Sequence, residues 1–412
     1  MAYNMQRRVV ITGLGVVAAN GIGKEAFWQA TSNGISGIKP IQRFPTGDLP
    51  ISVAGEAADF EVGAYIDRKL AKRIDRMTHF AFAAVQEALQ DANIILSQED
   101  PQCVGAVIAN TMGGVDYVLE QVQALYVRGP RFMSAYTAIA WLQVANVGQI
   151  SVHYGIQGYC KTPVNDTAGG LDALGMAYTA IRRGEADIII AGGCEAPLHP
   201  CVLLLLACSG HYVTGNDPNA YRPFDRRAAG LLLAEGAGIC IVEDFEHARR
   251  RGAHIYGEIV GYGQTNGTQG FLAPVSDSIQ YARAIQLTMQ EARLTPQEIG
   301  YFSLDGRALP ASDQAEAEAL HKIFGADLAH LPVSIPRTML GHSYAAAGAL
   351  DAITALLAFQ NGVIPPTINC EDFDPGCGLN MVRDEVRPLA QSAILIGGRS
   401  NGGANVVLAL RR

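Results

Sequence analysis

Short apolar runs bounded by glycine recur along the whole chain, and they constrain its fold more than any other feature. Many of the 45 glycines lie at the ends of such runs and mark boundaries between regular elements. The clearest runs are rich in Val, Ile and Ala and cover residues 8–12, 104–109, 186–191, 238–242, 393–396 and 405–410. Strands that are apolar on both faces are typical of sheets covered by helices. We therefore predict an α/β fold.

Amphipathic segments separate these predicted strands in both halves of the chain. Apolar residues recur at every third or fourth position, which predicts helices over residues 78–92, 171–183, 279–292, 313–324 and 345–360. Each half then runs strand, helix and glycine-rich strand in a similar order, as an ancient duplication would leave it. The basic stretch at residues 246–254 closes the first unit. We predict an N-terminal half of residues 1–250 and a C-terminal half of residues 251–412 that share one core.

The composition excludes several classes of function. The 412 residues are 49% hydrophobic and 17% charged, which argues against a disordered chain. A net charge of -8 provides no positive field for nucleic acid or anionic lipid. The longest apolar run, residues 201–208, is far shorter than the roughly 20 residues that span a bilayer. We expect no nucleic-acid partner and no membrane span.

The N-terminus and the cysteines indicate the cytoplasm. In MAYNMQRRVVITGLGVV the charges are followed at once by a glycine-broken strand pattern, without the apolar core and cleavage site of a secretory signal. The eight cysteines are scattered, with no C-x-x-C pair and no histidine spacing that suits zinc. We expect reduced thiols, no bound metal and a cytoplasmic location.

Residues 160–193, CKTPVNDTAGGLDALGMAYTAIRRGEADIIIAGG, indicate where chemistry is expected. They read as a short strand, a turn of small residues, a long helix and a buried strand. A side chain in that turn lies at a helix N-terminus, where free N–H groups and the helix dipole lower a thiol pKa and stabilise an oxyanion. A nucleophile would profit from this position.

Several long blocks resemble the β-ketoacyl-ACP synthases of the thiolase fold, and more narrowly the chain length factors of type II polyketide synthases. The blocks are VVITGLGVVAANGIG, MSAYTAIAWLQVANVGQIS, AGGLDALGMAYTAIRRGEADIIIAGGCEAP, YRPFDRRAAGLLLAEGAG, RTMLGHSYAAAGALDA and NGVIPPTIN. They keep the family's order and extend over nearly the whole chain. The resemblance implies two pseudo-duplicated halves in α-β-α-β-α layers.

The departures from the condensing members of that family fall on their catalytic groups. Aligned through Gly170, the nucleophilic cysteine corresponds to Thr167, and the first catalytic histidine corresponds to Asp305. The family's lysine corresponds to Arg337, and the second histidine remains as His342. The resemblance therefore implies a degenerate site with no confident catalytic residue.

Condensation is difficult with these substitutions. It needs a thiolate to hold the acyl primer, and imidazoles to polarise the malonyl thioester. The hydroxyl of an internal Thr167 has a far higher pKa than a thiol, and it lacks the N-terminal amine that activates threonine nucleophiles. An ionised Asp305 would oppose both the malonyl carboxylate and the developing enolate. We predict that Thr167 does not act as a nucleophile.

Structural roles stay open at the same positions. Thr167 can equally serve as a helix N-cap, whose side-chain oxygen binds a free N–H group. Asp305 can pair with Arg307 or with Arg337. His342 can be an inherited hydrogen-bonding residue of the turn in which it lies.

Replacement groups are also present in the sequence. A pair of Glu316 with Arg337 would take the place of the family's Glu and Lys bridge, and arginine suits scaffolding because it keeps its proton. Cys160 and Cys194 are the thiols on either side of the turn and helix, and we consider them as substitute nucleophiles. The alternative for both is a buried small apolar residue.

The resemblance assigns residues 111–140 to a dimer interface and to the tunnel that holds the growing chain. It places tunnel or gate positions at Val115, Val118, Val122 and Met133. Where related factors carry bulky aromatics, valines leave more volume, so we expect a fairly long or extended product. The spacing of the valines is equally typical of a plain core stripe.

Two basic segments have open roles. The stretch RKLAKRIDR, residues 68–76, can attract an acidic acyl carrier protein or form a solvated helix face. Residues 249–251 lie near a predicted helix C-terminus, where cations offset the dipole.

These observations favour a non-condensing chain length factor. It would form a heterodimer with a Cys-containing ketosynthase and shape the tunnel that sets polyketide chain length, with acyl chains delivered on the phosphopantetheine of acyl carrier protein and no other cofactor. The alternative is a self-sufficient acyltransferase or malonyl-ACP decarboxylase with a changed mechanism on the same fold. A structural pseudo-enzyme without a tunnel is the third hypothesis.

Overall fold

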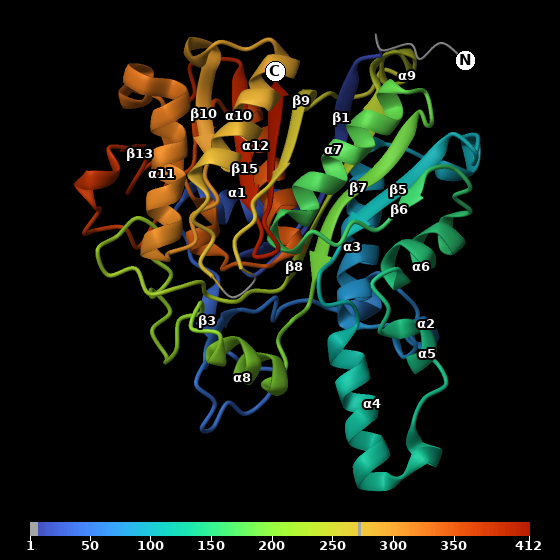
Figure 1. Cartoon of the computed structure of the whole chain (residues 1–412). Helices are drawn as coiled ribbons and strands as arrows, with labels where there is room; N and C mark the ends of the chain where they lie inside the picture. Colours follow the sequence, from blue (N-terminus) through green and yellow to red (C-terminus); the bar gives the residue numbers. More distant parts are fainter. Residues whose placement is uncertain (1–6, 271–272) are drawn as a thin grey trace.

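The computed structural model describes residues 7–270 and 273–412 (Figure 1). The strands of its main sheet are β1 (Val9–Ala18), β2 (Gly21–Ile22), β5 (Val104–Ala109), β6 (Cys160–Lys161), β7 (Ile188–Glu195), β8 (Gly236–Asp244), β9 (Gly257–Asn266), β10 (Ile299–Ser303), β11 (Pro332–Ser334), β13 (Asn380–Met381), β15 (Ala393–Arg399) and β16 (Ala404–Arg411). Their order across the sheet is β13-β11-β10-β15-β16-β9-β1-β8-β7-β5-β6, with β2 paired to β1. Two small ribbons pair β3 (Ile38–Pro40) with β4 (Val53–Gly55), and β12 (Val363–Ile364) with β14 (Arg387–Pro388).

Helices follow most of the strands. They are α1 (Lys24–Ser32), α2 (Arg68–Ala71), α3 (Arg76–Ala92), α4 (Val115–Arg128), α5 (Thr137–Ala140), α6 (Ala145–Tyr154), α7 (Gly169–Arg182), α8 (Pro200–Cys208), α9 (Phe245–Arg250), α10 (Ser278–Ala292), α11 (Pro310–Phe324) and α12 (Ala345–Asn361). In the part of the chain that the structure describes, none of them is long and apolar enough to cross a lipid bilayer.

The two halves of the sheet repeat one arrangement of strands. In the first half β1 and β8, and β8 and β7, are antiparallel, whereas β5 runs parallel to both β7 and β6. In the second half β9 and β16, and β16 and β15, are antiparallel, whereas β10 runs parallel to both β15 and β11. The halves join where β1 pairs with β9. This repetition is the duplication that the order of elements in the sequence suggested.

The halves of the sheet enclose two central helices. Helices α7 and α12 pack on each other between them, while α3 covers the outer face of the first half and α10 that of the second, with α11 packed on α10 (Figure 1). Apolar side chains from both halves form one core around the central pair, among them Ile11, Leu174, Ile353 and Leu408. The result is the α-β-α-β-α layering of the thiolase fold, and it confirms the predicted fold class.

Each predicted strand and helix is present, and its ends lie within about four residues of the predicted ones, except that β1 continues to Ala18 where the prediction ended at residue 12. Strand β9 was not predicted, because its residues alternate between buried and partly exposed positions and form no apolar run. Helix α4 carries Val115, Val118 and Val122, whose spacing is that of a helix. It projects from the lower end of the molecule, away from both halves of the sheet (Figure 1).

Candidate functional site

Thr167 lies in the 3-10 turn η4 (Asp166–Ala168), immediately before the central helix α7. The turn is tight, because Asp166 has a φ of 49°, in the left-handed region that few non-glycine residues enter. The Thr167 side chain is fully buried, and its hydroxyl donates to the carbonyl oxygen of Arg399. The N-cap of α7 is Ala168, without a side-chain bond, so the predicted capping role of Thr167 is wrong.

Asp305 follows β10 and is surrounded by arginine. Its carboxylate oxygens lie 2.9 Å from Nη1 of Arg337, 3.3 Å from Nε of Arg399 and 3.7 Å from Nη1 of Arg307. Burial alone would raise the pKa of Asp305, but the three guanidinium groups hold it well below its ordinary value. Asp305 is therefore an anion, paired with both of the arginines that the sequence offered as partners.

Two further carboxylates neutralise these arginines. Nη2 of Arg337 lies 2.5 Å from the carboxylate of Asp351, and Nη2 of Arg399 lies 2.9 Å from that of Glu316. Glu316 also accepts the backbone N–H of Asp305 at 2.9 Å. The predicted pair of Glu316 with Arg337 is wrong, because Asp305 and Asp351 occupy the donors of Arg337 while Glu316 faces Arg399.

We call these residues the arginine–carboxylate cluster: Asp305, Arg307, Glu316, Arg337, Asp351 and Arg399. Every member is at most 1% exposed. Three formal positive charges meet three negative ones, so the cluster is neutral as a whole. A buried charge that loses its partner costs several kcal/mol, and for this reason the members stabilise the fold only together.

His342 lies beside this cluster and is fully buried. Its Nε2 is 3.3 Å from Nη1 of Arg337, which can only donate, so Nε2 is the acceptor. Burial and the charges of Arg337 and Arg307 lower the pKa of His342 well below its ordinary value. The imidazole is therefore neutral and engaged, the structural role that the sequence left open.

Arg307 fills the space in front of Thr167. Its Nη1 lies 3.3 Å from the Thr167 hydroxyl oxygen and donates to the Arg399 carbonyl at 2.8 Å, and its Nη2 donates to Oδ1 of Asn401 at 2.7 Å. Arg307 is itself 0% exposed. A buried guanidinium group thus lies directly against the Thr167 hydroxyl.

Neither candidate thiol replaces the missing nucleophile. Cys194 is fully buried, and its sulfur accepts a bond from Nδ2 of Asn146 at 3.2 Å. Burial raises the pKa of the thiols of Cys194 and Cys160 above the ordinary value. A thiol that resists ionisation is a poor nucleophile. Among residues 7–270 and 273–412, no three His, Cys, Asp or Glu side chains are placed to hold a metal ion.

The predicted gate residues belong to α4 and to the segment that follows it. Val115, Val118 and Val122 are on α4 and only partly buried, and Met133 lies beyond its C-terminal end and is exposed. Tyr117 is the single buried residue of this fully described helix. The interpretation of the valines as a core stripe is therefore wrong.

Each basic segment lies only partly on the surface, because Arg76 and Arg251 bind the buried carboxylates of Glu235 and Glu243. Lys69 and Lys72 are exposed, whereas Arg73 stacks on the ring of Tyr136 at 4.7 Å. Arg251 is not a free helix-end cation, because it binds the buried carboxylate of Glu243 at 2.7 Å.

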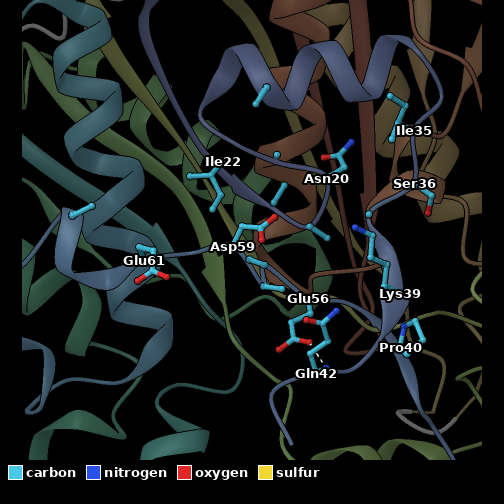
Figure 2. A pocket seen from close by; sticks show the side chains of 18 of the residues that line it. Asn20, Ile22, Ile35, Ser36, Lys39, Pro40, Gln42, Glu56, Asp59 and Glu61 are labelled. Atoms are coloured by element: carbon cyan, nitrogen blue, oxygen red, sulfur yellow. Dashed lines mark hydrogen bonds between the residues drawn. The ribbon is translucent and has the colours of Figure 1, made fainter.

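A separate hollow of about 540 Å³ lies near α1, β3 and the segment after β4 (Figure 2). Asn20, Lys39 and Asp59 line it, and Glu56 accepts the backbone N–H of Gln42 there at 2.7 Å (Figure 2). No member of the arginine–carboxylate cluster and no predicted site residue lines this hollow. We assign it no part in the site.

Three residues of the site were missed by sequence reasoning: Asp351, Arg399 and Asn401. Arg399 and Asn401 lie in the glycine-rich segment GGRSNGG at the end of β15. A charged residue at the end of a predicted buried strand is a usable signal, because buried arginines need partners. Asp351 lies within an otherwise apolar helix, α12, and carries the same signal.

Comparisons with known proteins agree with this geometry. The family model described as beta-ketoacyl synthase, N-terminal domain, matches residues 6–248, and the corresponding C-terminal domain model matches residues 256–371. The ketoacyl synthase beta subunit of the tetracenomycin polyketide synthase from Streptomyces glaucescens is 39% identical over 98% of each chain. A 3-oxoacyl-[acyl-carrier-protein] synthase 2 from Synechocystis is 34% identical over 100% of each chain.

Solved structures give the same result. A chain of the ishigamide ketosynthase/chain length factor superposes with a TM-score of 0.91 at 30% identity, over 98% of this chain and 99% of that one. A chain of AntDE:AntF, an acyl-carrier protein in complex with its ketosynthase, gives a TM-score of 0.89 at 30% identity, over 98% and 99%. These matches confirm the resemblance that the sequence blocks indicated.

Proposed function

The chain belongs to the β-ketoacyl synthase family, and we propose that within it the chain is a chain length factor, the non-condensing half of a ketosynthase pair. The observation that carries the proposal is the state of Thr167: fully buried, bonded to a backbone carbonyl and covered by Arg307. Asp305, where the family has a histidine, is an anion held by arginine. Condensation then depends on a partner that supplies the cysteine.

The surface around α4 supports a protein partner. Large apolar side chains are exposed there in one stretch of chain: Tyr126, Val127, Phe132, Ile139, Trp141, Val144 and Val152. Monomeric proteins rarely expose this much apolar surface in one place. The sheet also ends nearby at β6, which pairs on one side only with β5. A ketosynthase that covers this face and continues the sheet would bury both.

The proposed pairing with a ketosynthase also implies the kind of substrate. The relatives named above include a ketosynthase/chain length factor and a ketosynthase in complex with acyl-carrier protein. We place this chain in the same assembly, beside a tunnel in which the partner extends a chain delivered on the phosphopantetheine of acyl carrier protein. The site residues favour no second function, because an acyltransferase or decarboxylase would need an accessible nucleophile or base.

The proposal is tested by separating the two subunits' contributions. The chain is co-expressed with candidate ketosynthases, and the complex is exposed to acyl-ACP and weighed by intact mass spectrometry. We expect acyl mass on the ketosynthase alone. Thr167→Val, which keeps the shape of the side chain, should leave product formation within about twofold, whereas replacing the partner's cysteine should abolish it.

Two results would contradict this assignment. One is acyl mass on this chain. The other is condensation by the chain without a partner, lost in Thr167→Val. The variant removes the two buried hydrogen bonds of the Thr167 hydroxyl, with the Arg399 carbonyl and with Arg307, so its thermal stability is measured alongside to separate unfolding from lost chemistry.

A larger side chain on α4 is expected to shorten the product. Val118→Phe adds an aromatic ring at a partly buried position of α4, where it would fill tunnel volume that valine leaves free. Product lengths from the wild-type and variant complexes are compared by liquid chromatography and mass spectrometry.

The control for this experiment is Val386→Phe. Val386 is also a surface valine, 39% exposed, but lies in the C-terminal half, away from α4. It should leave product length unchanged. An unchanged length in Val118→Phe as well would remove this helix from the tunnel.

A further inference from the structure

Helix α4 is held to the body at its base. The segment before it is tied to the segment after α5, since the Gly114 N–H donates to the Trp141 carbonyl at 3.1 Å and Nδ2 of Asn110 donates to the Gln143 carbonyl at 2.7 Å. Beyond this base, Tyr117 is the only side chain of α4 that is buried. We call residues 115–140 the α4–α5 hairpin. The direction of the α4–α5 hairpin is set by the contacts at its base, where it leaves the body of the protein.

The base has no room for adjustment. A Cβ atom on Gly114 would lie 2.0 Å from the carbonyl oxygen of Ala140 and 3.0 Å from Cβ of Asp75. Gly113 has a φ of 62°, and a Cβ atom on it would lie 2.4 Å from the carbonyl oxygen of Trp141. The two backbones and Asp75 are therefore in direct contact.

One buried carboxylate connects this base to the rest of the fold. Asp75, 1% exposed, is the N-cap of α3, and its Oδ1 accepts the backbone N–H of Met77 at 2.7 Å. Its Oδ2 accepts the backbone N–H of Tyr117, in the first turn of α4, at 2.9 Å. A single side chain thus caps two helices whose N-terminal ends converge on it.

A second carboxylate fixes the chain just before the hairpin. Glu195, fully buried at the end of β7, accepts the backbone N–H groups of Thr111 at 2.8 Å and Met112 at 3.1 Å. Strand β7 therefore holds in place the residues that lead into α4. At the first turn of α4, the bond from Asp75 to the Tyr117 N–H is joined by an ion pair of Asp116 with Arg43 at 2.8 Å.

We propose that Asp75 is a positioning residue for product length: its bond to the Tyr117 N–H sets the angle at which α4 leaves the body, and hence where Val118 and Val122 stand in the tunnel. The inference rests on the proposed function. The helix has 14 residues, and at 1.5 Å per residue Val122 stands about 10 Å from the base. A tilt of about 10° there moves Val122 by roughly 2 Å, comparable with a two-carbon unit.

Asp75→Asn removes the tie to α4 and keeps the cap of α3. Asparagine is a good N-cap, so its oxygen still accepts the Met77 N–H, but its amide N–H₂ then faces the Tyr117 N–H, donor against donor. Asp75→Ser is the second variant, since serine also caps α3 but is too short to reach Tyr117. Asp67→Asn is the matched control: Asp67 caps α2 through the Lys69 and Leu70 N–H groups in the same way, without touching α4.

Two measurements are made on each variant in complex with the ketosynthase. Hydrogen exchange of the first turns of α4 should become about fivefold to tenfold faster in Asp75→Asn and Asp75→Ser, as expected for the loss of one hydrogen bond. The distribution of product lengths should broaden or shift in the same two variants. Asp67→Asn should match the wild type in both measurements.

The outcomes separate this inference from the proposed function. Unchanged exchange in α4, or faster exchange with an unchanged length distribution, would overturn the positioning role. Asp75→Asn could fail to form the complex because its amide opposes the Tyr117 N–H. In that case Asp75→Ser, which keeps the α3 cap without opposed donors, tests the positioning role by the same two measurements. The proposed function fails on other results, namely acyl mass on this chain or condensation without a partner. An unchanged product length in Val118→Phe removes α4 from the tunnel, and the exchange result still reports on the bond itself.

Discussion

Asparagine in place of Asp305 is expected to lower the free energy of unfolding by about 3–5 kcal/mol, the usual cost of breaking a buried ion pair. The physical reason is that Arg307, Arg337 and Arg399 all face this carboxylate, at 3.7, 2.9 and 3.3 Å. Without it, three buried cations share the two remaining carboxylates. Urea denaturation of the wild type and the variant, followed by circular dichroism, measures the difference.

A surface aspartate provides the comparison for this prediction. Asp217 lies 3.0 Å from Arg222, and its side chain is 51% exposed. Asp217→Asn should cost less than about 1 kcal/mol, as surface ion pairs usually do. If Asp305→Asn cost no more than Asp217→Asn, the arginine–carboxylate cluster would not be the buried ionic network described above.

The same substitution changes the acid stability of the chain. The pKa of Asp305 is below its ordinary value in the folded state, so the carboxylate stabilises the fold above the unfolded pKa of about 3.9. That contribution is lost as the pH falls toward the folded pKa. Between about pH 5 and pH 2, the melting temperature of the wild type should fall more steeply than that of Asp305→Asn.

The sequence reveals those parts of the fold whose side chains serve a core. Strand β5 is buried at every position, and the prediction over residues 104–109 matches it. Helix α4 has apolar residues too, but most of them face no core in this chain, and Glu120 and Gln123 are interspersed with them. The spacing of Val115, Val118 and Val122 indicates a helix, but it does not tell whether the apolar side chains pack on this chain or on another protein.

The candidate site, like the fold, could be predicted from the sequence only in part. The positions of Thr167 and Asp305 follow from the aligned blocks, because the backbone of the fold brings them together. The partner of Arg337 does not follow, since several buried carboxylates lie within reach and side-chain directions decide among them. Asp351 on α12 takes the place that sequence reasoning gave to Glu316. Spacing along the chain carries no information on that choice.

Cysteine in place of Thr167 is expected to remain unmodified in the folded chain, although it restores the family's nucleophile. Arg307 would favour a thiolate at this position, but the site is 0% exposed and the Arg307 side chain covers it. His342 is neutral and accepts a bond from Arg337, so it is not free to take the thiol proton. Alkylation by iodoacetamide then requires an opening that costs on the order of 5 kcal/mol, which slows it by about 10³-fold or more.

The double variant Thr167→Cys with Arg307→Ala is expected to react at least about tenfold faster than the single one, because it removes the side chain in front of the sulfur. Peptide mass spectrometry distinguishes this cysteine from Cys201 and Cys208, which are exposed and serve as internal controls in the same sample. If the single variant were alkylated as fast as Cys201, access to the site would be open, and Arg307 would not close the approach to residue 167. Slower alkylation of Thr167→Cys than of the double variant would instead reveal two separate changes at this site: the nucleophile is lost, and the approach to its position is closed. A chain altered in both respects would need more than one substitution to regain an acylated cysteine.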